Sequence, residues 1–219
     1  MDIKNLINQL PDRQVLKKNC KALAVLDWII CGQEFEIYHR FFKSNQEEYE
    51  GEEAQIGFDF EDEEGTSLHI YFTDKSCLIV PSESNLSQGV DNKAFEKRIP
   101  KEFHAFYKKN YENQDIPFVV YSVNNEPWKY EENFEIEGTE EEYHNFNHLQ
   151  ADADFYHDWA MNFFGDETFL KKDADLQSIT NIFEGKTLTE NIVLSIVEKV
   201  ADWTDLEKAL NELPYRFDF

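Results

Sequence analysis

The sequence predicts an α+β protein, with an antiparallel meander sheet, a buried N-terminal helix and a helical C-terminal third. Three observations indicate this fold class. An apolar helical pattern occupies residues 12–30, period-two alternation recurs between residues 34 and 80, and helix-start signals recur after residue 138. The order of one helix, four strands, one helix and two strands favours this arrangement over a doubly wound parallel sheet.

The N-terminal helix is expected over residues 12–30, after a short helical turn at 3–10 that Pro11 stops. Its apolar residues cover nearly the whole circumference, which is typical of a buried helix. The helix is expected to end at Gly32, because glycine readily adopts the left-handed conformation that closes many helices.

Four strands are expected next, over residues 34–42, 54–60, 66–73 and 77–80, and Pro81 is expected to end the last of them. Alternation separated by turn-rich segments is typical of an antiparallel meander. A helix over 100–111 is expected to open at Pro100, and two further strands follow over 116–123 and 128–136.

After residue 138 the pattern becomes helical, with helices expected over 140–150, 154–164, 175–183, 187–197 and from 204 to about 214. Capping boxes that begin at Thr187 and Thr204 mark two of these starts. No linker rich in Pro, Gly or Ser precedes this part. We therefore expect one domain over residues 1–219, with a helix-plus-sheet core at 1–137 and a helical portion at 138–219.

The charge is strongly acidic, with 45 Asp and Glu against 21 Lys and Arg and a net charge of −24. Such a surface repels phosphate backbones and anionic membranes, so neither a nucleic acid nor a membrane is expected as partner. The expected partner is a cationic protein; the alternative is that acidity only keeps the protein soluble. Cys20, Cys31 and Cys77 lack paired spacing, and no long apolar segment opens the chain, which favours a cytoplasmic protein.

Acidic runs form the candidate surface for a cationic partner, because a concentrated negative field speeds encounter with positive charge. A solvated rim is the alternative for each run. The residues are Glu47, Glu48, Glu50, Glu52 and Glu53 before one expected strand, and Glu61, Asp62, Glu63 and Glu64 in the turn after it.

Asp27 interrupts the apolar stripe of the N-terminal helix and is therefore expected to be buried, with His39 and Arg40 on the next strand as partners. One interpretation is a functional acid in a pocket. The other, which we favour, is a structural hydrogen bond that locks the helix to the strand.

His144 and His148 lie one helical turn apart, and Asp152 follows one turn later, so the three have a spacing that can bind one divalent metal ion. Chance clustering on a polar helix face is the alternative, since no fourth ligand is evident. Apart from this metal, no cofactor is expected. The nearby Phe155, Trp159 and Phe163 recur at helical spacing and are expected to belong to the core.

A set of segments spread over most of the chain carries a family likeness: residues 20–27, 34–36, 51–53, 99–103, 118–128 and 188–190, with Leu206, Pro214 and Tyr215. In these segments the chain resembles an uncharacterised family of bacterial cytoplasmic proteins with no established activity. The resemblance assigns no catalytic residue, and the segment around His144 and His148 is not part of the family pattern.

The excess of acid, without a nucleophile, cofactor or phosphate motif, favours a non-catalytic protein-interaction module over an enzyme. Its concrete form is an immunity-type protein that masks a cationic toxin or nuclease. The alternatives are a divalent-metal-binding enzyme or sensor that uses His144 and His148, and a nucleic-acid mimic whose carboxylates imitate phosphates.

Overall fold

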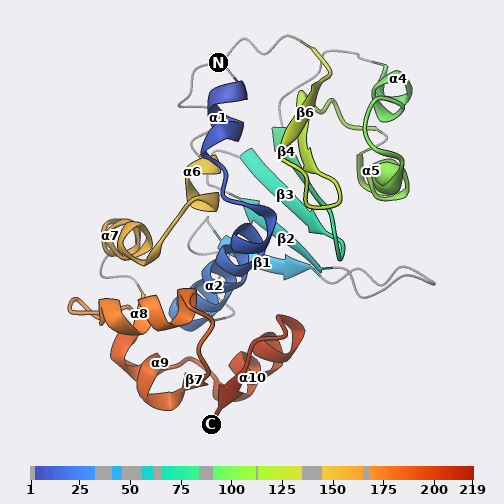
Figure 1. Ribbon diagram of the computed structural model, residues 1–219. Helices are drawn as coiled ribbons and strands as arrows, with labels where there is room; N and C mark the ends of the chain where they lie inside the picture. Colours follow the sequence, from blue (N-terminus) through green and yellow to red (C-terminus); the bar gives the residue numbers. More distant parts are fainter. Residues whose placement is uncertain are drawn as a thin grey trace. The chain divides into compact units, whose positions relative to one another are not determined.

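The computed structural model describes residues 3–32, 41–45, 56–61, 66–83, 91–111, 113–134, 145–164 and 168–219. The chain folds into two compact units, the first made of Met1–Arg13 and Asn45–Phe146, the second of Gln14–Ser44 and Asn147–Phe219. The long N-terminal helix thus belongs to the same unit as the C-terminal helices. The sequence analysis instead grouped this helix with the sheet, in residues 1–137. The α+β class with an antiparallel sheet is confirmed (Figure 1).

The first unit is built on a meander, as the alternation predicts. Strands β2 (Ile56–Glu61), β3 (Thr66–Phe72), β4 (Cys77–Glu83), β5 (Phe118–Ser122) and β6 (Lys129–Glu132) lie side by side in chain order, each antiparallel to the next. β1 (Phe41–Asn45) belongs to the second unit except for its last residue. Most of the strand expected over 34–42 lies outside the described residues.

Pro81 does not end β4, contrary to the prediction. The strand continues through Pro81 to Glu83 and pairs with β3 along its whole length. The pairing with β5 covers only Cys77, Leu78 and Ile79. Pro81 lies beyond this second ladder, where β3 is the only strand that pairs with β4 among the described residues, and a strand tolerates proline at such an edge position.

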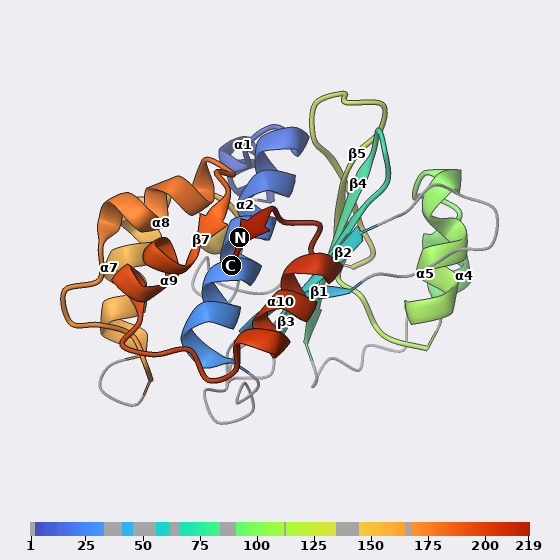
Figure 2. The ribbon, with the colours of Figure 1, turned by 90° about the horizontal axis from the view of Figure 1, so that it is seen from below.

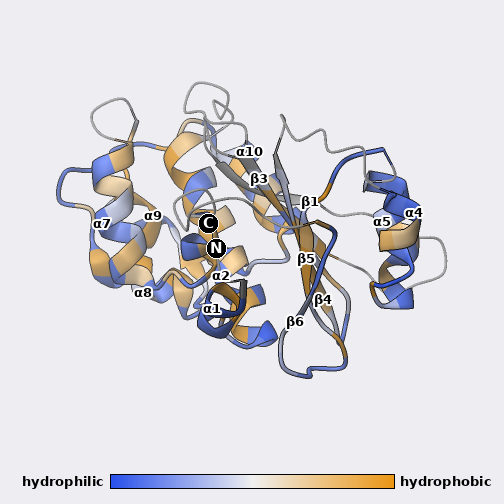
Figure 3. Cartoon of the chain, turned by 90° about the horizontal axis from the view of Figure 1, so that it is seen from above, coloured by the Kyte–Doolittle hydropathy of each residue, from blue (hydrophilic) through white to orange (hydrophobic). Residues whose placement is uncertain are grey.

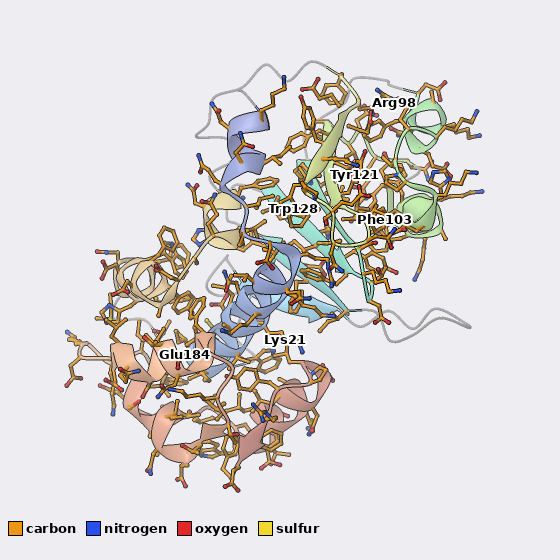
Figure 4. The ribbon with its side chains drawn as sticks, viewed as in Figure 1. Lys21, Arg98, Phe103, Tyr121, Trp128 and Glu184 are labelled. Carbon is orange, nitrogen blue, oxygen red and sulfur yellow. The ribbon has the colours of Figure 1, made fainter. Side chains whose placement is uncertain are left out.

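Short helices cover one face of the sheet, namely α4 (Asn92–Glu96), the 3-10 turn η1 (Lys101–Phe103) and α5 (His104–Tyr111) (Figure 2). The ring of Tyr71, from β3, stacks on that of Phe106, from α5, with centroids 4.0 Å apart. Figure 4 labels Phe103 and Tyr121 in this layer. The buried cluster comprises Tyr71, Leu78, Val80 and Val119 from the strands with Phe95, Ile99, Phe103, Phe106, Tyr107, Tyr111 and Ile116.

Side-chain hydrogen bonds fasten the loops of the first unit to its sheet. Arg98, after α4, donates from Nη1 to the carbonyl of Glu132 at 2.7 Å (Figure 4). Trp128 donates from Nε1 to the carbonyl of Pro11 at 2.7 Å, which ties the segment after α1 (Ile3–Gln9) to the hairpin of β5 and β6.

The second unit is mainly helical and contains α2 (Arg13–Cys31), α7 (Ala153–Phe163), α8 (Leu176–Phe183), α9 (Glu190–Ile196) and α10 (Trp203–Glu212). All but the first residue of α6 (Phe146–Leu149) also belongs to this unit. A parallel pair, β7 (Leu188–Thr189) with β8 (Phe217–Asp218), is not predicted by the sequence. No helix within the described ranges is both long and apolar enough to cross a membrane.

Helix ends in the second unit confirm one prediction and correct two. Gly32 closes α2 with φ +61°, and its amide donates to the carbonyl of Trp28. The caps expected at Thr187 and Thr204 are wrong, because Thr189 caps α9 and Asp202 caps α10. Leu188 and Thr189 are held extended as β7, so α9 begins two residues later than the capping box indicates.

Candidate functional site

The acidic runs singled out from the sequence lie almost entirely outside the described residues. Glu47, Glu48, Glu50, Glu52, Glu53, Asp62, Glu63 and Glu64 are among the residues left out, and Glu61 is placed only as the last residue of β2. The prediction that these runs form one negative surface therefore stays a prediction.

The histidine segment is partly described. His144 lies outside the described residues, whereas His148 is only 6% exposed. The ring of His148 packs edge-on against Phe155 and Trp159, with centroids 5.5 and 5.3 Å away. Asp152 caps α7 by accepting the amide of Phe155 at 2.9 Å. Within the described part of the chain no three His, Cys, Asp or Glu residues gather to hold a metal ion, and the metal site stays a prediction.

Asp27 is buried, as its place in an apolar stripe predicts, with 1% of its surface exposed. The hydroxyl of Tyr156, on α7, donates to its Oδ1 at 2.7 Å. His39 and Arg40, the expected partners, lie outside the described residues. The hydrogen bond joins the inward face of α7 to α2, because Tyr156 lies on the same buried side of α7 as Ala153 and Ala160.

α7 presents a row of aromatic side chains to solvent. Phe155 and Phe163 are 40% and 38% exposed, and the half-buried Trp159 lies between them. Trp159 and Phe163 stack with centroids 4.8 Å apart and planes 24° from parallel. The expectation that this row belongs to the core is wrong, because the inward face of α7 is formed by Tyr156 and Ala160, one position further along.

A row of carboxylates runs beside the aromatic row. Asp158 lies three positions after Phe155, so these two side chains are neighbours on the helix surface, and Asp154 lies one helical turn before Asp158. Both aspartates are exposed, and residues 145–164 contain no Lys or Arg. Figure 3 shows hydrophobic and hydrophilic colours side by side around α7. We call Asp154, Phe155, Asp158, Trp159 and Phe163 the acidic–aromatic face.

A second group of interacting polar side chains lies in the first unit, and the sequence analysis missed it. His69 on β3 contacts Asp59 on β2 through Nδ1, at 2.8 Å, and Ser67 through Nε2, at 3.3 Å. Period-two alternation places Ser67 and His69 on one face of β3, and this signal was available in the sequence. Asp59 could not be assigned from the sequence, because its position opposite His69 depends on the register of the two strands.

A small cavity of about 150 Å³ lies between the end of α2 and the start of α10. Trp28 and Leu206 form part of its wall, with Asp202 and Asp205 as polar groups. Asp202 accepts the amides at the start of α10, and Asp205 pairs with Lys208 at 2.8 Å. These carboxylates therefore already have structural roles, and the cavity is the weaker candidate.

No family model, curated protein or solved structure matches this chain. The resemblance to a bacterial cytoplasmic family therefore stays a prediction. Two groups of side chains stand out as candidate functional sites, the acidic–aromatic face of α7 and the contacts of His69.

Proposed function

We propose that this protein is an interaction module of the cytoplasm that binds a cationic protein partner through the acidic–aromatic face of α7. The observation that carries the proposal is the pair of exposed rings of Phe155 and Phe163, the second of them stacked on the half-buried Trp159, beside exposed carboxylates. An immunity-type role, in which the module covers a cationic toxin or nuclease, is its concrete form. The three buried thiols, Cys20, Cys31 and Cys77, support a reducing compartment.

The chemistry of this face suits arginine and lysine side chains. A guanidinium or ammonium group placed over an aromatic ring gains about 0.5–2 kcal/mol, depending on how far it is desolvated. Asp154 and Asp158 lie close enough along the helix to attract the same charge. Trp is also the residue type most enriched among interface positions that dominate binding energy, which makes Trp159 the expected anchor.

The overall charge adds attraction at long range. A net charge of −24 raises the rate at which a cationic protein meets this one, and salt weakens the effect. A role in solubility accounts for the carboxylates, but it does not account for the exposed rings of Phe155 and Phe163 beside them. Single exposed apolar residues are common, but a contiguous apolar patch marks an interaction surface.

The test is capture of partners from a lysate of the native host, with the tagged protein as bait and mass spectrometry as readout. We expect the captured protein to be basic, and a gene for it to lie near the gene for this chain. Trp159→Ala with Phe163→Ala should weaken binding about 30-fold or more, since an anchor residue contributes about 2 kcal/mol or more.

A charge-matched control separates the effect of the carboxylates on this face from the effect of the net charge of the whole protein. Asp154→Asn with Asp158→Asn should slow association about tenfold at low salt. Glu190→Gln with Glu198→Gln removes the same charge from exposed positions away from the aromatic row and should have a much smaller effect. Equal losses in the two pairs, or capture of only acidic or neutral proteins, would contradict the proposal.

A further inference from the structure

A chain of three polar side chains crosses strands β2 and β3 of the first unit. Asp59 Oδ1 lies 2.8 Å from His69 Nδ1, and His69 Nε2 lies 3.3 Å from Ser67 Oγ. Asp59 and His69 are directly opposite each other in the register, and Ser67 lies two residues before His69 on the same face. The sheet therefore holds a carboxylate, an imidazole and a hydroxyl in the order found at activated serine nucleophiles.

The contact with Asp59 decides which nitrogen of neutral His69 carries the proton. An ionised carboxylate only accepts hydrogen bonds, so Nδ1 is assigned the proton and donates it to Asp59. Nε2 then faces the Ser67 hydroxyl as an acceptor. The other acceptor near this hydroxyl, the carbonyl of Ser82, is more distant at 3.5 Å. We propose that Ser67 is a nucleophile that takes the acyl group of a small ester, with His69 as general base and Asp59 as the positioning residue.

The reaction balances with water as the only co-substrate. The Ser67 proton moves to His69 Nε2 as the bond between Oγ and the acyl carbon forms. The carbon–oxygen bond of the ester then breaks, and the proton passes from His69 to the departing alcohol. Water, deprotonated by His69, attacks the acyl carbon, and Ser67 regains its proton as the carboxylic acid leaves.

The three side chains are accessible without being fully solvated. The side chains of His69 and Asp59 are 26% and 15% exposed, and Ser67 is partly exposed. The ring of Tyr111, from α5, lies 5.6 Å from that of His69 between centroids, and Tyr71 follows on the same face of β3. Both tyrosines are buried, at 3% and 4% exposure, so they form an apolar wall on one side of the three polar groups, and the ester has to reach these groups from solvent.

Two probes test the proposal on the full chain, a fluorophosphonate and p-nitrophenyl acetate, with peptide mass spectrometry to locate the adducts. Serine Oγ displaces fluoride from the first and p-nitrophenolate from the second. We expect an adduct at Ser67 with both, lost in Ser67→Ala and formed on the order of 100-fold more slowly in His69→Ala. Added imidazole should restore part of the rate in His69→Ala, which a structural role for His69 would not allow.

Three further variants serve as controls. Ser82→Ala alters the residue opposite Ser67 on β4 and should leave labelling unchanged. Asp59→Asn should slow labelling about tenfold or more, and Asp59→Glu should recover part of the rate. Trp159→Ala should not affect labelling, so the result is independent of the proposed binding function.

Absence of both adducts from folded wild-type protein would overturn the proposal. So would an adduct at Ser67 that forms equally fast in His69→Ala. If circular dichroism shows that His69→Ala does not fold, the labelling rate of Asp59→Asn is compared with that of the wild type instead. Equal rates in these two proteins would overturn the proposal.

Discussion

Gly32 ends α2 in the left-handed conformation, and its replacement by alanine tests how this helix end packs. Its φ is +61°, and a Cβ placed there would lie 3.0 Å from the Cβ of Ala201. The left-handed conformation costs an L-residue about 1–2 kcal/mol. Compression of the Cβ–Cβ contact adds about 1–3 kcal/mol. Alanine also lowers the entropy of the unfolded chain, which offsets about 0.4–1 kcal/mol. Gly32→Ala should therefore lower the free energy of unfolding by about 3 kcal/mol, within a range of about 1–5 kcal/mol.

Gly185 provides a matched control, because its φ is +73° and a Cβ there would meet nothing within 4 Å. Gly185→Ala should cost only about 1 kcal/mol, since it carries the backbone strain without the contact. Urea titration of both variants gives the difference, and thermal melts should place Gly32→Ala about 5 °C below Gly185→Ala. Adding Ala201→Gly to Gly32→Ala should recover most of this difference. Equal losses in the two single variants would refute the packing argument.

Three tyrosines give further expectations. Tyr107→Phe should raise the free energy of unfolding by about 1 kcal/mol, because the buried Tyr107 hydroxyl has no hydrogen-bond partner within the described residues; a less stable variant in urea would contradict this. Burial raises the pKa of Tyr215 to about 12, so the neutral hydroxyl stabilises the fold below pH 10 and this stabilisation is lost as the pH rises towards 12. The stability of Tyr215→Phe should therefore fall less steeply over that window, as measured by urea titration at each pH. Tyr156→Phe removes the hydrogen bond to Asp27 and should cost about 1.5–3 kcal/mol in urea titrations; a loss below about 0.5 kcal/mol would mean that other donors satisfy this carboxylate.

Most of the fold follows from periodicity, and the misses have local causes. Alternation identified β2 and β3 nearly to the residue, and the all-round apolar pattern identified α2. α4 was missed because five residues are too short to show a helical period. The start of α9 was placed too early because β7 depends on pairing with β8, from the far end of the chain, and no local signal reports this.

The candidate sites were missed or misplaced for the same reason, because tertiary contacts and strand register leave no signal in the local sequence. Spacing correctly placed Phe155, Trp159 and Phe163 on one stripe of a helix, but it could not show which stripe faces inward. That orientation depends on tertiary contacts such as the hydrogen bond between Tyr156 and Asp27. The pairing of Asp59 with His69 was missed for a related reason, because cross-strand neighbours are set by register.

Hydroxyl-radical footprinting of the complex with the captured partner tests the central claim most directly, because it reports the solvent access of individual side chains. Binding should suppress oxidation of Phe155, Trp159 and Phe163, while Trp203, on α10, should oxidise as in the free protein. If the partner is bound and the three α7 side chains still oxidise at their free rate, the acidic–aromatic face is not the binding surface.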